Sequence, residues 1–122
     1  MNDNRLYETT STDGNATAIT MCADHPVYQG HFPGNPITPG VMTLKMIREC
    51  VEAIEKKPLH YATIKNCRFA AVIRPGDRLV LSTETTPNGN TITVKATLTD
   101  TDNATRLQLE AELRQNQDDG EI

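Results

Sequence analysis

The stretch from His25 to Val51 reads HPVYQGHFPGNPITPGVMTLKMIRECV and decides the fold. Its first half is rich in proline and glycine and surrounds one histidine, His31. Each proline fixes one φ angle and restricts the residue before it, so we expect a stiff loop. The second half changes to a helical period. The stretch therefore predicts a loop that holds a reactive side chain against the start of a helix.

The helix is expected from about Pro39 to Lys57. Apolar residues recur there at steps of three and four, which places them on one face of a helix. Lys56 and Lys57 suit the negative C-terminal end of the helix dipole, and Pro58 stops the helix. The apolar stripe consists of Leu44, Ile47, Val51 and Ile54.

The rest of the chain is predicted to form strands. Apolar residues alternate with polar ones, as in an antiparallel sheet that covers a core on one face. Turn residues separate the runs, most clearly in Pro87-Asn88-Gly89-Asn90. One apolar helix and one apolar sheet face predict an α+β fold in which the sheet curls around the helix. The expected strands cover residues 6–10, 16–22, 60–69, 78–85, 92–98 and 107–113.

Composition limits the class of protein. The 122 residues suit one domain, which we place at residues 1–114, followed by a polar tail at 115–122 that we expect to be disordered. The net charge of −4 and the 4% aromatic content argue against a nucleic-acid surface. No run is long enough to span a membrane. Three cysteines in no motif spacing indicate reduced thiols in the cytoplasm.

The motifs resemble those of one enzyme family. The first motif is Gly30-His31-Phe32-Pro33-Gly34, followed by Pro36-Ile37 and Pro39-Gly40-Val41. The second is Cys67-Arg68-Phe69, followed by Arg74-Pro75-Gly76-Asp77. Both are similar to motifs of the hot-dog-fold β-hydroxyacyl-acyl-carrier-protein dehydratases. The resemblance covers roughly residues 16–113. It implies a hot-dog fold, in which a curved antiparallel sheet of about six strands wraps a long central helix.

The resemblance also implies a reaction, the loss of water from a 3-hydroxyacyl thioester to give a trans-2-enoyl thioester in fatty-acid-type biosynthesis. Such a lyase needs a base for the C2 proton, an acid for the leaving hydroxyl, and donors for the thioester oxygen. His31 matches the catalytic histidine of the family. Gly40 and Val41 would offer backbone N–H groups to the thioester oxygen.

Partners and substrate contacts follow from the same resemblance. The substrate would arrive on an acyl carrier protein, and the chain would act as a homodimer or a dimer-based oligomer, with the active site between subunits. No cofactor is implied, and the three histidines lack the spacing of a metal site. The candidates for the apolar wall of the acyl site are Tyr28, Phe32, Pro33, Ile37, Val41, Met42 and Phe69.

One position departs from the family pattern. Lys45 stands where the dehydratases carry a helix carboxylate. A charged ammonium only donates hydrogen bonds, whereas a carboxylate accepts them, so Lys45 has an uncertain role. Lys45 could instead be a solvated residue paired with Glu49 one turn along. Glu49 and Asp24 are the nearest alternative carboxylates, and Glu49 lies about 6 Å further along the helix.

Three hypotheses follow for the function. The first is a 3-hydroxyacyl thioester dehydratase that uses His31 and the helix start. The second is a hot-dog thioesterase, which would need a residue that activates water, a task to which Lys45 is poorly suited. The third is a non-catalytic subunit that binds an acyl chain or a carrier protein, paired with an active homologue.

Overall fold

The computed structural model describes residues 5–30 and 36–116. His31, Phe32 and Pro33, and the end of the expected tail at 117–122, lie outside the described residues. The elements in chain order are β1 (Tyr7–Asp13), β2 (Ala16–Met21), α1 (Val27–Gly30), α2 (Gly40–Glu55), β3 (Leu59–Phe69), β4 (Arg78–Asn88), β5 (Thr91–Asp100) and β6 (Thr105–Gln115).

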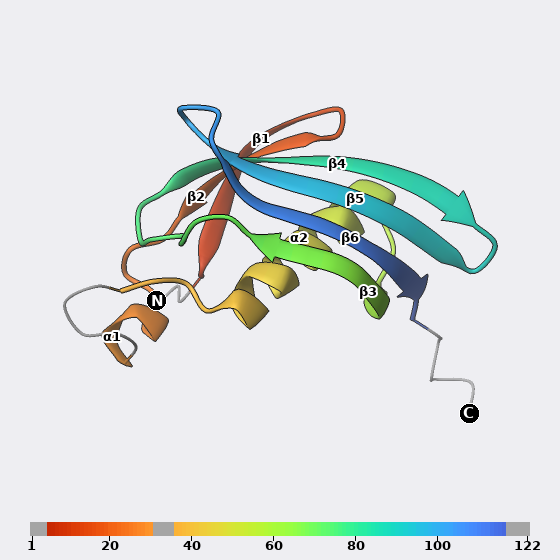
Figure 1. Cartoon of the computed structure of the whole chain (residues 1–122), viewed down its shortest axis with the longest axis horizontal. Coiled ribbons are helices and arrows are strands. Elements are labelled where there is room, and N and C mark those ends of the chain that lie inside the picture. Colours follow the sequence, from red (N-terminus) through yellow and green to blue (C-terminus); the bar gives the residue numbers. More distant parts are fainter. Residues whose placement is uncertain (1–4, 31–35, 117–122) are drawn as a thin grey trace.

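The six strands form one sheet in the order β1-β2-β4-β5-β6-β3, and every neighbouring pair is antiparallel. The sheet curves over α2, which lies along its concave side (Figure 1). This confirms the α+β class and the hot-dog architecture. β1 and β3 are the two edge strands, so among the described residues β3 has a hydrogen-bonded neighbour on one side only.

The core lies between α2 and the sheet. The alternation expected in β5 and β6 is confirmed, because Ile92, Val94, Ala96, Leu98, Leu107, Leu109, Ala111 and Leu113 are all buried. The helix stripe is confirmed only in part. Ile47 and Val51 are buried, but Leu44 and Ile54 are half-buried. The helix turns a slightly different face to the sheet, which buries Thr43, Met46 and Cys50 as well.

The ends of α2 follow local chemistry. Pro39 is the N-cap residue in an extended conformation, and Gly40 is the first helical residue. At the other end Lys56 adopts a left-handed conformation with φ 61°, and its N–H bonds to the Glu52 carbonyl at 2.7 Å. Glu55 is thus the last helical residue, two positions before the expected end.

Two features differ from the expectations. The short helix α1 is not among the expected elements. β4 continues through Pro87 and Asn88, which were expected in the turn, so the hairpin turn itself contains only Gly89 and Asn90. Gly89 takes a positive φ of 65°, which glycine adopts without strain. Among the described residues, no helix has the length and apolar character needed to cross a membrane.

Candidate active site

The start of α2 presents backbone donors that the helix itself does not use. The first hydrogen bonds of the helix run from the N–H groups of Met42 and Thr43 to the Pro39 carbonyl, at 3.1 and 3.2 Å. The N–H groups of Gly40 and Val41 precede this ladder and have no partner within the helix. Pro39 has no side-chain group that could cap them. The side chain of Val41 is 75% exposed, so this helix end opens to the surface.

An apolar pocket of about 470 Å³ lies beside Gly40. The ring of Phe69 closes over the glycine so tightly that a Cβ at Gly40 would lie 3.0 Å from the ring atom Cζ. The glycine therefore allows Phe69 to approach the helix backbone, while 49% of the Phe69 side chain stays exposed. The pocket is lined by Ile37, Thr38, Gly40, Thr43, Phe69, Ala70, Ala71, Val72 and Ile73.

A second pocket, of about 500 Å³, lies between the N-terminal part of the chain and α2. Met42, Lys45 and Glu49 line it from the helix. The Tyr7 hydroxyl donates a hydrogen bond of 2.8 Å to Glu49 Oε1. Burial, followed by the bond to Glu49, raises the pKa of Tyr7, so the phenol stays protonated and keeps this bond.

The structure gives Glu49 a different partner from the one considered above. In the described part of the chain no ion pair joins Lys45 to Glu49, because the carboxylate turns to Tyr7. Lys45 is exposed. The other carboxylate considered, Asp24, is also exposed and does not line the pocket that contains Lys45.

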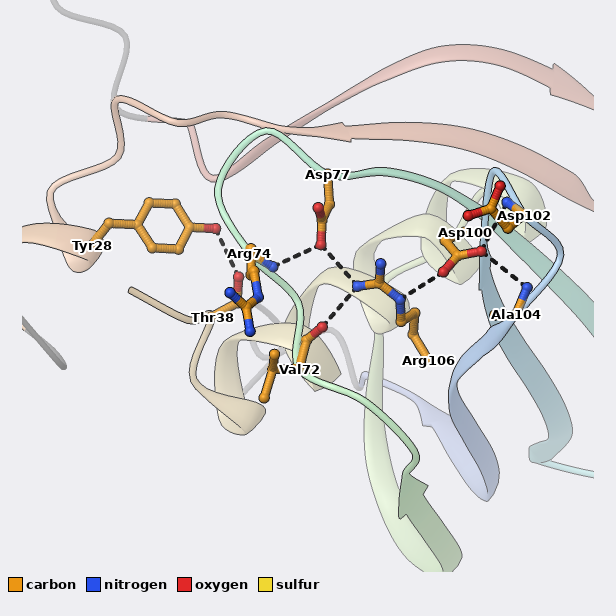
Figure 2. Close-up of polar contacts among 9 residues, drawn as sticks. All are labelled: Tyr28, Thr38, Val72, Arg74, Asp77, Asp100, Asp102, Ala104 and Arg106. Carbon is orange, nitrogen blue, oxygen red and sulfur yellow. Dashed lines mark hydrogen bonds and ion pairs between the residues drawn. The ribbon is translucent and has the colours of Figure 1, made fainter. Parts of the chain in front are cut away.

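Tyr28 and His25 fix the segment that precedes the expected loop around His31. Tyr28 is buried, and its hydroxyl lies 2.7 Å from Thr38 Oγ1 (Figure 2). His25 Nδ1 accepts the N–H of Val27 at 3.0 Å, which leaves the proton of a neutral ring on Nε2. The bond fixes the ring at the start of α1. Both side chains therefore hold the segment that leads into the loop of His31.

Of the site residues expected from sequence that the structure describes, five line one of the two pockets, whereas Tyr28 and Val41 line neither. Ile37, Gly40 and Phe69 come together at the apolar pocket. Met42 and Lys45 line the pocket next to Glu49 instead. The role of His31 stays a prediction, as do those of Phe32 and Pro33, because these three residues lie outside the described part.

Sequence reasoning did not find the bonds that hold the loop of residues 70–77. The Thr38 N–H bonds to the Ile73 carbonyl at 2.7 Å, which joins this loop to the start of α2. Arg106 binds the loop from the sheet (Figure 2). The only sequence signal was the Arg74-Pro75-Gly76-Asp77 turn. Within the described residues, no group of three or more His, Cys, Asp or Glu side chains could hold a metal ion.

The chain matches the ApeI-like family, described as ApeI dehydratase, over residues 8–116. A 3-hydroxyacyl-(acyl-carrier-protein) dehydratase FabZ from Caldanaerobacter subterraneus subsp. tengcongensis is 41% identical in an alignment 68 residues long, which covers 50% of this chain and 48% of the relative. A FabZ from Chloroflexus aggregans is 41% identical in an alignment 71 residues long, which covers 52% of this chain and 49% of the relative. The chain spans about half the length of the curated relatives it matches.

Among solved structures, the dehydratase heterocomplex ApeI:P from Xenorhabdus doucetiae aligns with a TM-score of 0.64 and 19% identity, over 88% of this chain and 95% of that chain. At this identity the likeness shows the fold alone. The ApeI-like match extends from the second residue of β1 to the residue after β6. It therefore includes the helix start, the whole lining of the apolar pocket and the part of the second pocket that α2 contributes, and the chain belongs to the ApeI-like dehydratase family.

Proposed function

We propose that this chain is a 3-hydroxyacyl thioester dehydratase whose substrate is carried by an acyl carrier protein. The product would be a trans-2-enoyl thioester. The observation that supports this most directly is the start of α2, where two backbone N–H groups without a helical partner adjoin an apolar pocket of about 470 Å³. Such a pair suits a thioester whose carbonyl oxygen gains negative charge while its acyl chain stays among apolar side chains.

In this proposal His31 takes the proton from C2 of the substrate. The electrons of the C–H bond form the C2–C3 double bond, and the C3–O bond breaks. The leaving hydroxyl takes a proton from a solvent water molecule and departs as water, while the proton held by His31 passes to the solvent hydroxide. An imidazole with a pKa near ~6.5 exchanges protons readily at neutral pH. The N–H groups of Gly40 and Val41 stabilise the thioester oxygen, on which charge accumulates during the step.

The alternative is a non-catalytic subunit that pairs with an active homologue. Lys45 favours it, because this exposed ammonium stands at the position of the family carboxylate. The ApeI:P structure, which shares this fold, is a dehydratase heterocomplex, and this supports pairing with a different subunit as the arrangement under this alternative. Under this alternative the chain would bind an acyl chain or a carrier protein without converting it.

The deciding experiment supplies purified protein with a 3-hydroxyacyl carrier-protein thioester and follows the products by mass spectrometry. Loss of water is the expected result. His31→Ala should abolish it and leave the circular dichroism spectrum unchanged, because the imidazole is the proposed base. Retained dehydration in His31→Ala would remove His31 from the mechanism.

The remaining outcomes separate the alternatives. Release of free acid would identify a thioesterase, and binding without conversion would identify the non-catalytic subunit.

Lys45→Glu restores the family carboxylate on an exposed side chain. We expect dehydration to increase in this variant if Lys45 limits the natural chain, and an unchanged rate would show that the position is not limiting.

A further inference from the structure

Arg106, the second residue of β6, binds three acceptors, two in the loop of residues 70–77 and one at the end of β5. Its Nη1 donates to the Val72 carbonyl at 2.7 Å and to Asp77 Oδ2 at 2.8 Å. Its Nε donates to Asp100 Oδ2 at 3.0 Å. Figure 2 shows the guanidinium between these groups. We call Arg106, Asp77, Asp100 and the Val72 carbonyl the Arg106 cluster.

Both carboxylates of the cluster are fixed by further bonds. Asp77 Oδ2 also accepts the Arg74 N–H at 2.8 Å, within the turn that follows Val72. Asp100 Oδ1 accepts the N–H groups of Asp102 and Ala104 at 2.9 and 3.0 Å, within the turn between β5 and β6. The guanidinium therefore joins two rigid turns, and its side chain is only 19% exposed.

The cluster continues to the candidate active site. The Arg106 carbonyl accepts the N–H of Ala70 at 2.9 Å, and the guanidinium binds Val72 two residues later. Ala70 and Val72 both line the apolar pocket. The next residue, Ile73, is buried and accepts the Thr38 N–H at 2.7 Å. Because Thr38 lies two positions before Gly40, the bonds run from the sheet through the loop to the start of α2.

We propose that Arg106 is a positioning residue, which holds the loop of residues 70–77 against the start of α2 so that the pocket wall and the Gly40 and Val41 donors keep one relative geometry. The inference rests on the proposed function for its kinetic consequences. Arginine suits the task because its planar fork reaches several acceptors at fixed angles, which a single ammonium group cannot do. Its removal would also leave two carboxylates without their shared cation.

The test compares Arg106→Lys with a matched variant, Arg48→Lys. Like Arg106, Arg48 combines ion pairing with a bond to a backbone carbonyl, although it has one carboxylate partner, Glu52 at 3.0 Å, where Arg106 has two; its carbonyl partner is Leu59 at 3.3 Å. Its side chain is 24% exposed, close to that of Arg106. Arg48 lines neither the apolar pocket nor the one next to Glu49. A purely structural role would therefore give the two variants similar effects.

Kinetically, we expect Arg106→Lys to lower kcat/KM for dehydration by about tenfold or more per folded molecule, since a small misplacement of catalytic groups is costly. The rise in KM should be larger for long acyl chains than for short ones, because Ala70 and Val72 form part of the pocket wall. Arg48→Lys should leave this chain-length dependence unchanged. Equal kinetics in both variants would overturn the proposal.

A second measurement does not depend on activity. Amide chemical shifts and hydrogen exchange of Thr38, Gly40 and Val41 should change in Arg106→Lys and stay constant in Arg48→Lys. Unchanged amides in Arg106→Lys would refute the positioning role even in an active enzyme. Inactive wild-type protein whose amides respond as expected would refute only the proposed function. If Arg106→Lys does not fold, Asp100→Asn weakens one bond of the cluster, and the same amides decide the question.

Discussion

At the scale of single residues, Gly40 and Phe69 form the tightest contact of the candidate site. Gly40 does not adopt a positive φ, so its backbone conformation does not require glycine. The absence of a Cβ is needed only for the close approach of the Phe69 ring. Gly40→Ala would place a Cβ at 3.0 Å from Phe69 Cζ, and the half-exposed ring can tilt away into the pocket. The better helix propensity of alanine offsets part of the cost of moving the ring, by at most about 0.5–1 kcal/mol, the value for a helix interior, because Gly40 is the first helical residue.

We therefore expect Gly40→Ala to change the free energy of unfolding by less than about 1 kcal/mol. KM for the acyl thioester should rise severalfold, because the displaced ring narrows the pocket. Chemical denaturation and steady-state kinetics measure the two quantities. In a Phe69→Ala background the same substitution should leave KM nearly unchanged. An equal rise in both backgrounds would show that the effect does not pass through the ring.

At the scale of elements, β1 and α2 are joined at Tyr7, Glu49 and Cys50. Cys50 is 5% exposed, and burial raises the pKa of its thiol from the ordinary 9.0 to about 11. The folded chain thus holds this proton more tightly than the unfolded chain. The contribution to stability is complete below pH 9 and is lost as the pH rises toward 11. A shift of this size corresponds to at most about 3 kcal/mol.

The expected result is a fall in the unfolding free energy between pH 9 and pH 11 that is smaller in Cys50→Ala than in the natural chain. Urea titrations at a series of pH values measure it. Burial also raises the pKa of Tyr7 and Tyr61, so a fall above pH 10 remains in the variant. The difference between the two curves isolates Cys50, and parallel curves would contradict the assignment.

The elements also show what sequence can predict. The alternation of apolar and polar residues was sufficient to predict β5 and β6, because one face of each strand is buried and the two strands pair directly with each other. Side-chain partners were not predictable in the same way. Glu49 bonds to Tyr7, which is 42 positions away, rather than to Lys45 on the next turn. Arg106 meets Val72 from 34 positions away. Only the folded sheet brings such residues together, so spacing along the chain does not reveal them.

The position of the site was predictable to a similar extent. The motif around Gly40 identified the helix start, because glycine and proline have specific local effects there. The split of the expected lining residues into two pockets was not predictable. Met42 lies two residues after Gly40, yet the turn of the helix directs it toward the pocket next to Glu49 and not toward Phe69.

At the scale of the whole molecule, β3 is an edge strand of the sheet. In the part of the chain that the structure describes, it pairs with β6 on one side and has no strand on the other. Side chains of a strand alternate between the two faces, yet all five residues from Ala62 to Asn66 are exposed, so both faces are open there. Ile64, near the middle of this segment, is an exposed large hydrophobic residue. An uncovered edge of this kind is a surface for pairing with another chain, and we propose a homodimer through β3.

Ile64→Lys tests this assembly. A charge on the edge strand disfavours pairing with a second chain, so the variant should shift from about twice the 13.5 kDa mass of one chain toward the mass of a single chain. Light scattering coupled to gel filtration measures the mass over a range of concentrations.

Val80→Lys is the matched control, because Val80 is also an exposed large hydrophobic residue but lies on β4, which has a neighbour on each side. Val80→Lys should remain dimeric. A dimer of unchanged affinity in Ile64→Lys would exclude β3 as the contact, whereas dissociation of both variants would indicate a general effect of added charge. If the active site forms between subunits, as the family resemblance implies, dehydration per chain should fall in parallel with the dimer fraction of Ile64→Lys and recover at high protein concentration.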